Sequence, residues 1–181
     1  VASWEPLNPA RAEVVVHAAA DGAATRRPVT AALWSVAASR DGSLLWVGTG
    51  DRRLAALPVA GGDGRAATLP GIPESLAVAD TLVVAGLWLE SGAAGVAPDG
   101  ALRWTLAAPE PARRWEPVLS ADGRVLLLRS AVGPDRSDAR IARADPATGT
   151  LLWERPFPGD DRRLALSADG ARIALSSAVL V

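Results

Sequence analysis

The chain has 181 residues, of which 49% are hydrophobic, and 19 lysine and arginine residues against 20 acidic ones give it a formal net charge of −1. General nucleic-acid binding requires a basic face and membrane-surface binding a polybasic patch, so this charge predicts neither. Without cysteine there are no disulfides, thiolate nucleophiles or cysteine-ligated metals. No apolar run approaches the roughly 20 residues of a membrane-spanning helix, so we expect no membrane insertion.

The composition also bears on the source of the chain. Every basic side chain other than histidine is arginine, and glutamine and tyrosine are absent; GC-rich coding in a bacterium accounts for this bias. The chain begins at Val1 with no signal-peptide pattern. We therefore expect a trimmed sequence that does not include any native export signal, and both a cytoplasmic and an exported location stay open.

Short apolar strands separated by tight turns follow one another along the chain. The first pair flanks Asp21-Gly22, and later strands are expected over 44–50, 81–89, 124–132 and 172–181. These segments are rich in Val, Leu and Ile and are bounded by glycine or Asp-Gly, which suits tight hairpin turns. Because 14 prolines and 17 glycines interrupt any long helical pattern, we expect an all-β protein.

Two series of turns recur with a period near 40 residues. In the first series, an aspartate follows an alternating apolar run; its members are Asp41, Asp80, Asp122 and Asp169. They are spaced by 39, 42 and 47 residues. The second series lies between them and ends at Gly22, Gly62, Gly100 and Gly149. Two interleaved turn series with one period indicate two hairpins, and hence four antiparallel strands, in each repeat.

Four-stranded antiparallel units of about forty residues are typical of the blades of a β-propeller. The alternative is an ordinary β-sandwich, which also has many short strands and turns. We favour the propeller, because a sandwich has no reason to keep one phase over four copies. The expected blades are 31–70, 71–111 and 112–160, with a fourth blade split between 1–30 and 161–181.

That split would join both termini in one sheet and remove free strand edges. Because four blades are few for this kind of repeat, we expect the chain to be part of a larger propeller, or a piece that pairs with a second copy. Self-association would use the exposed blade edges, including the apolar final segment 173–181.

One repeat carries a more specific signature. The segment ADPATGTLLW at 144–153 resembles the repeat of PQQ-like (quinoprotein dehydrogenase-like) propellers, and APDGALRW at 97–104 resembles a degenerate copy of it. WD40-like propellers have units of the same size. The resemblance implies that Trp104 and Trp153 dock between neighbouring blades. At the matching places in the first two repeats we expect Arg26 and Thr68.

Enzymes of the PQQ-like family hold a quinone in the central channel above a metal bound by Glu, Asn and Asp, often capped by adjacent cysteines. This chain has no cysteine and a single asparagine, Asn8, so the cofactor site cannot be transferred, and we expect no cofactor and no metal. What the resemblance implies is a scaffold without catalysis.

Catalytic groups are sparse in the sequence as well. The one histidine, His17, lies inside an apolar run and is interpreted as a packed or edge residue, without a nucleophile elbow to form a triad. The paired carboxylates Asp160 and Asp161 are interpreted as solvated charges in a turn. We therefore predict no catalytic residues.

A partner surface is expected at one rim of the channel, where the innermost strand of each blade begins. Aligning the repeats on their turn aspartates brings a set of aromatic and charged residues to that rim: Trp34, Glu74, Trp115, Glu116, Arg162 and Arg163. Trp and Arg are frequent hot-spot residues in interfaces. The alternative is that the two tryptophans pack between blades and the charges are simply solvated.

Four Arg-Arg pairs, at 26–27, 52–53, 113–114 and 162–163, allow two interpretations. Arginine forks suit phosphate and carboxylate, so pairs gathered on one face would predict anion binding. Pairs scattered over the molecule would instead be surface ion pairs.

The leading functional prediction is a non-catalytic β-propeller scaffold that binds a protein or peptide partner through loops at one rim. The second prediction is a quinoprotein-like cofactor-binding or enzymatic domain. A third, weaker one is a role in bacterial radiation or desiccation stress tolerance, which rests on lineage analogy only.

Overall fold

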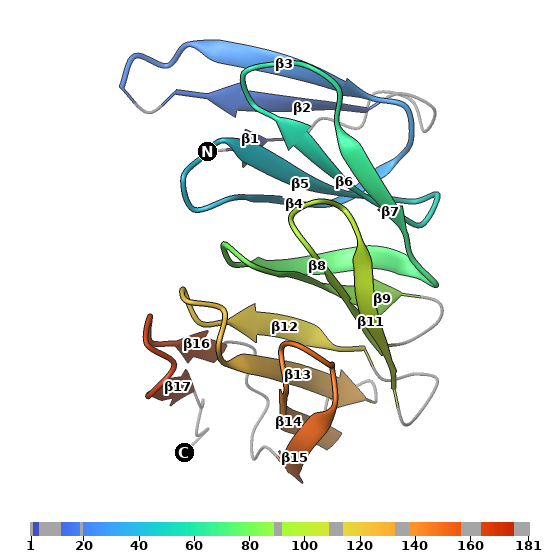
Figure 1. Ribbon diagram of the computed structural model, residues 1–181, viewed down its shortest axis with the longest axis vertical. Helices are drawn as coiled ribbons and strands as arrows, with labels where there is room; N and C mark the ends of the chain where they lie inside the picture. Colours follow the sequence, from blue (N-terminus) through green and yellow to red (C-terminus); the bar gives the residue numbers. More distant parts are fainter. Residues whose placement is uncertain are drawn as a thin grey trace, which may run out of the picture.

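The computed structural model describes residues 2–3, 12–18, 20–88, 92–108, 114–132, 138–156 and 164–175 (Figure 1). All regular elements in these ranges are β-strands, which confirms the all-β prediction. The strands before the first complete blade are β1 (Ala2–Ser3), β2 (Ala12–His17) and β3 (Ala24–Val29). Together they form the N-terminal sheet, in the order β1-β2-β3.

Three complete four-stranded sheets follow, each an antiparallel meander in chain order. Blade 1 consists of β4 (Leu33–Ala38), β5 (Leu44–Thr49), β6 (Arg53–Pro58) and β7 (Arg65–Thr68). Blade 2 consists of β8 (Ile72–Val78), β9 (Val83–Trp88), β10 (Gly92–Val96) and β11 (Leu102–Ala107). Blade 3 consists of β12 (Glu116–Leu119), β13 (Leu126–Val132), β14 (Asp138–Ala144) and β15 (Leu151–Pro156).

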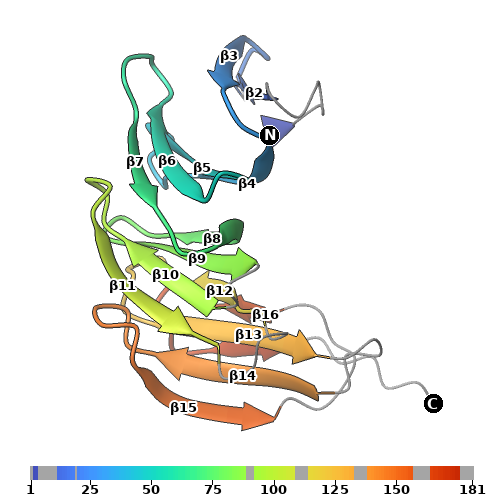
Figure 2. The ribbon, with the colours of Figure 1, turned by 90° about the vertical axis from the view of Figure 1, so that its right-hand side faces the viewer.

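The last two strands, β16 (Leu164–Leu166) and β17 (Ile173–Leu175), form the C-terminal hairpin. The three blades stack in an open arc, with the N-terminal sheet beyond blade 1 and the C-terminal hairpin beside blade 3 (Figures 1 and 2). Among the described residues, β1–β3 and β16–β17 lie in separate sheets, and the joining of 1–30 with 161–181 in one split blade stays a prediction.

Apolar side chains from facing sheets fill the spaces between the blades. Trp46 and Leu54 of blade 1 pack with Val83 and Val96 of blade 2 in one buried cluster. A second buried cluster joins blades 2 and 3, and its larger members are Leu82, Val84, Trp104, Trp115, Leu126 and Leu128. Burying an apolar side chain of this size contributes about 1.5–3 kcal/mol, so contacts between blades, rather than single sheets, stabilise the fold.

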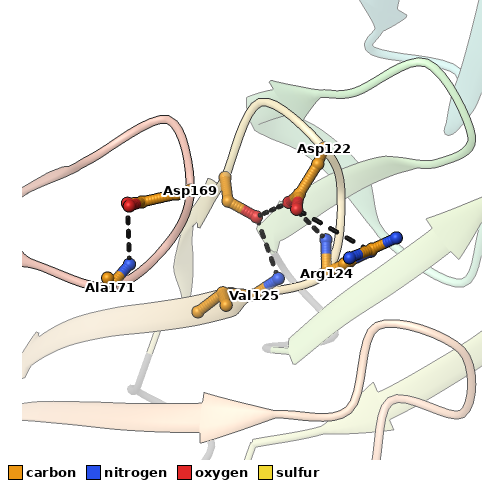
Figure 3. A network of polar contacts seen from close by, with 6 residues as sticks. Asp122, Arg124, Val125, Asp169 and Ala171 are labelled. Atoms are coloured by element: carbon orange, nitrogen blue, oxygen red, sulfur yellow. Dashed lines mark hydrogen bonds and ion pairs between the residues drawn. The ribbon is translucent and has the colours of Figure 1, made fainter.

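The turn of the inner hairpin is built in the same way in three repeats. In blade 3 the Ser120 hydroxyl donates to Asp122 at 2.6 Å and accepts from the Val125 amide at 2.9 Å. The Asp122 carboxylate also accepts from the Arg124 amide at 3.0 Å (Figure 3). These hydrogen bonds favour the ionised carboxylate and lower the pKa of Asp122, the Ser120 hydroxyl being the largest cause.

The same serine–aspartate arrangement closes the turns at Ser39-Asp41 and Ser167-Asp169. The pKa of Asp41 is lowered to about 2, first by the Ser39 hydroxyl, and that of Asp169 is lowered in the same direction by Ser167. Neighbouring turns also touch, because the Ala121 amide donates to the Ala168 carbonyl at 3.1 Å. The repeat seen in the sequence thus corresponds to a repeated set of serine–aspartate hydrogen bonds in the inner turns.

Candidate partner-binding rim

The innermost strands of blades 1 and 2 both contain a β-bulge at the same place. Strand β4 pairs with β5 through Leu33–Thr49 and Ser35–Gly48, which leaves Trp34 unpaired. Strand β8 pairs with β9 through Pro73–Leu87 and Ser75–Gly86, which leaves Glu74 unpaired. An unpaired bulge residue has its side chain re-aimed relative to a regular strand. The fold therefore presents both side chains at the rim where the inner strands begin.

Two further residues complete a cluster around these side chains. The Trp34 and Trp88 rings lie 4.6 Å apart between centroids, tilted by 32°. The Arg114 guanidinium lies over the Trp88 ring, with its Cζ 5.6 Å from the centroid, in the geometry of a cation–π contact. Its Nη1 also donates to both Glu74 carboxylate oxygens, at 3.0 and 3.2 Å. We call Trp34, Glu74, Trp88 and Arg114 the rim cluster.

The rim cluster is open to solvent. Trp34 is 40% exposed, which is unusual for so large an apolar side chain. The side chains of Arg114 and Glu74 are 49% and 36% exposed. Only Nη1 of Arg114 contacts Glu74, so the remaining N–H groups of the guanidinium have no acceptor among the described residues. The cluster thus offers an aromatic surface next to unused hydrogen-bond donors.

Trp115 was predicted at this rim, and that prediction is wrong for its side chain. It occupies the position equivalent to Trp34 and Glu74, but it is only 1% exposed and packs between blades 2 and 3. Strand β12 starts after it, at Glu116, so no bulge turns the indole outward. Its Nε1 has no hydrogen-bond partner among the described residues. Trp115 therefore has a packing role, as the alternative interpretation held.

The other predicted rim residues do not join the cluster. Glu116 is exposed and forms an ion pair with Arg129, directly opposite it on β13. Arg162 and Arg163 lie outside the described residues. Sequence reasoning missed Trp88 and Arg114. One signal was available for each: Trp88 ends the strand that pairs with the start of β8, and Arg114 lies two residues before the next inner strand.

The remaining candidates do not form a second site. His17 is exposed, with Nδ1 3.4 Å from the Gly22 carbonyl oxygen. The described members of the arginine pairs have separate partners, such as Glu13 for Arg26 and the Pro70 carbonyl for Arg52. Arg113, Arg162 and Arg163 lie outside the described residues, so the anion-binding hypothesis stays a prediction. Asp160 and Asp161 lie outside the described residues.

Other kinds of site were sought in the part of the chain that the structure describes. It contains no group of three His, Cys, Asp or Glu side chains arranged to hold a metal ion. None of its elements is a helix of the length and apolar character needed to cross a membrane. A cavity of about 240 Å³ lies between the N-terminal sheet and blade 1, lined by Val29 and Val47 among others. A second, of about 310 Å³, lies beneath the turns of blades 2 and 3.

The docking role that the resemblance implied for Trp104 is confirmed. Its indole N–H donates to the Pro146 carbonyl of blade 3 at 2.8 Å, and its ring covers Gly149 in the Asp-Pro-Ala-Thr-Gly turn. Trp153 packs in the cluster between blade 3 and the C-terminal hairpin. Both rings therefore fill space between neighbouring sheets.

The equivalents in the first two repeats differ from the expected Arg26 and Thr68. Arg65 pairs with Ala56 as Trp104 pairs with Gly95, and its Cβ faces Gly100 of the next blade. Thr68 lies three residues further along β7. In the N-terminal sheet, the arginine that reaches the next turn is Arg27, which donates to the carbonyl oxygens of Pro58 and Gly62. The turn before β7 contains three glycines, and the four-residue spacing of the motif leads from Gly61 to Arg65 but from Gly64 to Thr68, so counting from the wrong glycine misplaces the residue.

Comparison with known proteins supports the fold but does not assign the chain to a family. No family model and no curated protein matches the chain. Among solved structures, BamB from Moraxella catarrhalis is 20% identical with a TM-score of 0.62, over 85% of this chain and 48% of that one. The Cps50 (Swd1) β-propeller domain of Myceliophteria thermophila is 15% identical with a TM-score of 0.71, over 97% and 59%.

A chain of the Mitotic Checkpoint Complex is 16% identical with a TM-score of 0.69, over 91% of this chain and 51% of that one. The chain thus spans about half the length of the solved propellers it matches. These likenesses, together with the stacked four-stranded sheets, show that the chain has the β-propeller fold, in about four blades' worth of sequence.

Proposed function

We propose that this chain is a non-catalytic β-propeller scaffold that binds a protein or peptide partner through the rim cluster. The observation that carries the proposal is the exposed Trp34 ring, which lies against the tilted Trp88 ring, while Arg114 lies over Trp88. Trp and Arg are the residues most often found at interface hot spots. A bulge that turns a large apolar ring into solvent costs stability, and a partner that covers the ring would offset that cost.

The fold comparison supports the same class of function. One chain that resembles this one belongs to the Mitotic Checkpoint Complex, where it is part of a multi-protein assembly. The proposal assigns no catalytic residue, cofactor or metal to the chain. Its alternative, a quinoprotein-like domain, would be recognised by a quinone absorbance band after reconstitution with the cofactor and a divalent cation.

The test is a comparison of proteins that co-purify with three forms of the chain from a native lysate. These are the wild type, the Trp34→Ala variant and the Leu152→Ala variant, which serves as a matched control because Leu152 is 55% exposed but lies on the outermost strand β15. We expect one stoichiometric partner that is lost with Trp34→Ala and kept with Leu152→Ala. A partner retained by all three forms, or no partner at all, would contradict the proposal.

A further inference from the structure

We propose that the partner segment bound by the rim cluster is an extended peptide in which a proline lies three residues from a glutamate or aspartate. This inference rests on the proposed function and specifies its ligand. It follows from three properties of the cluster. These are the exposed aromatic surface of Trp34, the N–H groups of Arg114 that do not contact Glu74, and the distance between Trp34 and Arg114.

The aromatic part of the cluster suits a proline ring. Trp88 lies against Trp34, and the Nε1 edge of the Trp34 ring lies close to Gly50, yet 40% of the residue is exposed. Flat indole surfaces of this kind pack against the rigid pyrrolidine ring. Proline-rich segments in the polyproline II conformation also lose little entropy on binding, and their carbonyl groups have no internal hydrogen bonds.

The charged part of the cluster suits a carboxylate. Arg114 uses a single nitrogen for Glu74, so its other N–H groups can donate to a second carboxylate in a charge-assisted hydrogen bond. Glu74 itself competes for the same guanidinium. The cluster can therefore bind an acidic side chain, and competition from Glu74 sets the affinity of that binding.

The distances set the spacing between the two ligand residues. The ring-to-ring separation of 4.6 Å and the ring-to-guanidinium separation of 5.6 Å together limit how far Trp34 lies from Arg114. One turn of a polyproline II helix has three residues and rises about 9 Å, and it returns the side chain to the same face. The rise of one turn lies within this limit, so residues three apart in such a helix can reach both receptor groups.

The experiment uses short fluorescent peptides of serine and threonine that contain one proline and one glutamate, measured by fluorescence anisotropy against the wild-type chain. One pair of peptides places the glutamate three residues before or after the proline. Control peptides shift the glutamate by one residue, replace it with glutamine, or replace the proline with alanine. We expect at least one peptide of the pair to bind about tenfold more tightly than its controls.

Variants of the chain then assign the contacts. Trp34→Ala weakens the preferred peptide about thirtyfold, as expected for a hot spot, while Leu152→Ala leaves binding unchanged. Arg114→Gln removes the preference for glutamate over glutamine. Glu74→Gln strengthens binding of the glutamate peptide several-fold because it frees the guanidinium, whereas a purely structural role of Glu74 predicts weaker binding.

Equal binding of all peptides, or binding by none of them, overturns this inference. So does a preference for glutamate that survives in Arg114→Gln. Because the peptides are varied against the unaltered chain, the result does not depend on the folding of any variant. If the lysate experiment yields a partner that requires Trp34 but the peptides do not bind, the proposed function stands and the proline–acid ligand is rejected.

Discussion

The junction between blades 1 and 2 and the junction between blades 2 and 3 are alike on the channel side and different on the outer side. On the channel side, a glycine of the second strand faces a backbone carbonyl of the next blade in both: Gly48 faces Pro73, and Gly86 faces Trp115. On the outer side, Arg65 stands at the first junction where Trp104 stands at the second. On the channel side the backbones approach so closely that only glycine fits, whereas the space on the outer side accepts different side chains.

The largest expected loss of stability comes from a substitution on the outer side of the junction between blades 2 and 3. Trp104→Ala removes a buried ring and the hydrogen bond to the Pro146 carbonyl, and we expect it to lower the free energy of unfolding by about 3–5 kcal/mol. Arg65→Ala, at the equivalent but exposed position, is the control and should change it by about 0.5 kcal/mol or less. Urea denaturation measures both, and similar losses for the two variants would show that the junctions do not differ.

The next largest loss of stability is expected from substitutions on the channel side of the two junctions. A Cβ atom at Gly86 would overlap the Trp115 carbonyl oxygen, and at Gly48 it would lie 2.5 Å from the Pro73 carbonyl oxygen. We expect Gly86→Ala to cost about 1–3 kcal/mol, as overpacking does, and Gly48→Ala to be destabilising as well but less so. Thermal unfolding of both variants checks the order, and wild-type stability in either one would refute the close approach.

A smaller loss of stability is expected when the hydrogen bond from Ser35 is removed while the close approach of Gly48 to Pro73 is kept. The Ser35 hydroxyl donates to the Pro73 carbonyl of the next blade at 2.6 Å. Ser35→Ala leaves this partly buried acceptor without its donor, which should cost about 1 kcal/mol. Ser35→Thr keeps the hydroxyl and serves as the comparison. Equal stability of the alanine variant and the wild type would mean that the glycine contact alone sets the junction.

The smallest effect lies within one blade and should leave the junctions untouched. Ser39→Ala removes the hydroxyl that lowers the pKa of Asp41 to about 2, so the pKa should rise toward its ordinary value of 3.8. Because the folded-state pKa is depressed, the stabilisation is present above pH 4 and is lost as the pH falls toward 2. A carbon-detected NMR titration of the carboxyl group measures the shift, and an unchanged midpoint would contradict the role given to Ser39.

Local turn chemistry explains how much of the fold could be predicted from the sequence. Asp41 and Asp122 mark turns that depend only on residues next to them, so the repeat and the four-stranded unit follow without tertiary information. The docking of Trp104 could be predicted because the PQQ-like repeat that its segment resembles has a docking tryptophan at that place. The fold class is therefore confirmed from short-range signals.

The rim cluster could be predicted only in part, for a physical reason. Trp34 and Glu74 were found by aligning repeats, but Trp88 and Arg114 join them only because three successive blades meet at this rim. Whether an inner strand begins with a bulge depends on its pairing with the second strand, and the sequence does not state that pairing. For this reason the repeat alignment predicts Trp115, like Trp34, at the partner rim, whereas its side chain is buried between blades.

The ion pair between Glu116 and Arg129 has a consequence for how the repeats can be rearranged. It stands in blade 3 at the register occupied by Ser35 and Gly48 in blade 1, and by Ser75 and Gly86 in blade 2. Blades 1 and 2 therefore both present a glycine of the second strand to the sheet that follows, and we expect copies of either blade to stack closely in a tandem array. Blade 3 has a charged pair at this register instead, so we expect copies of blade 3 to stack less closely.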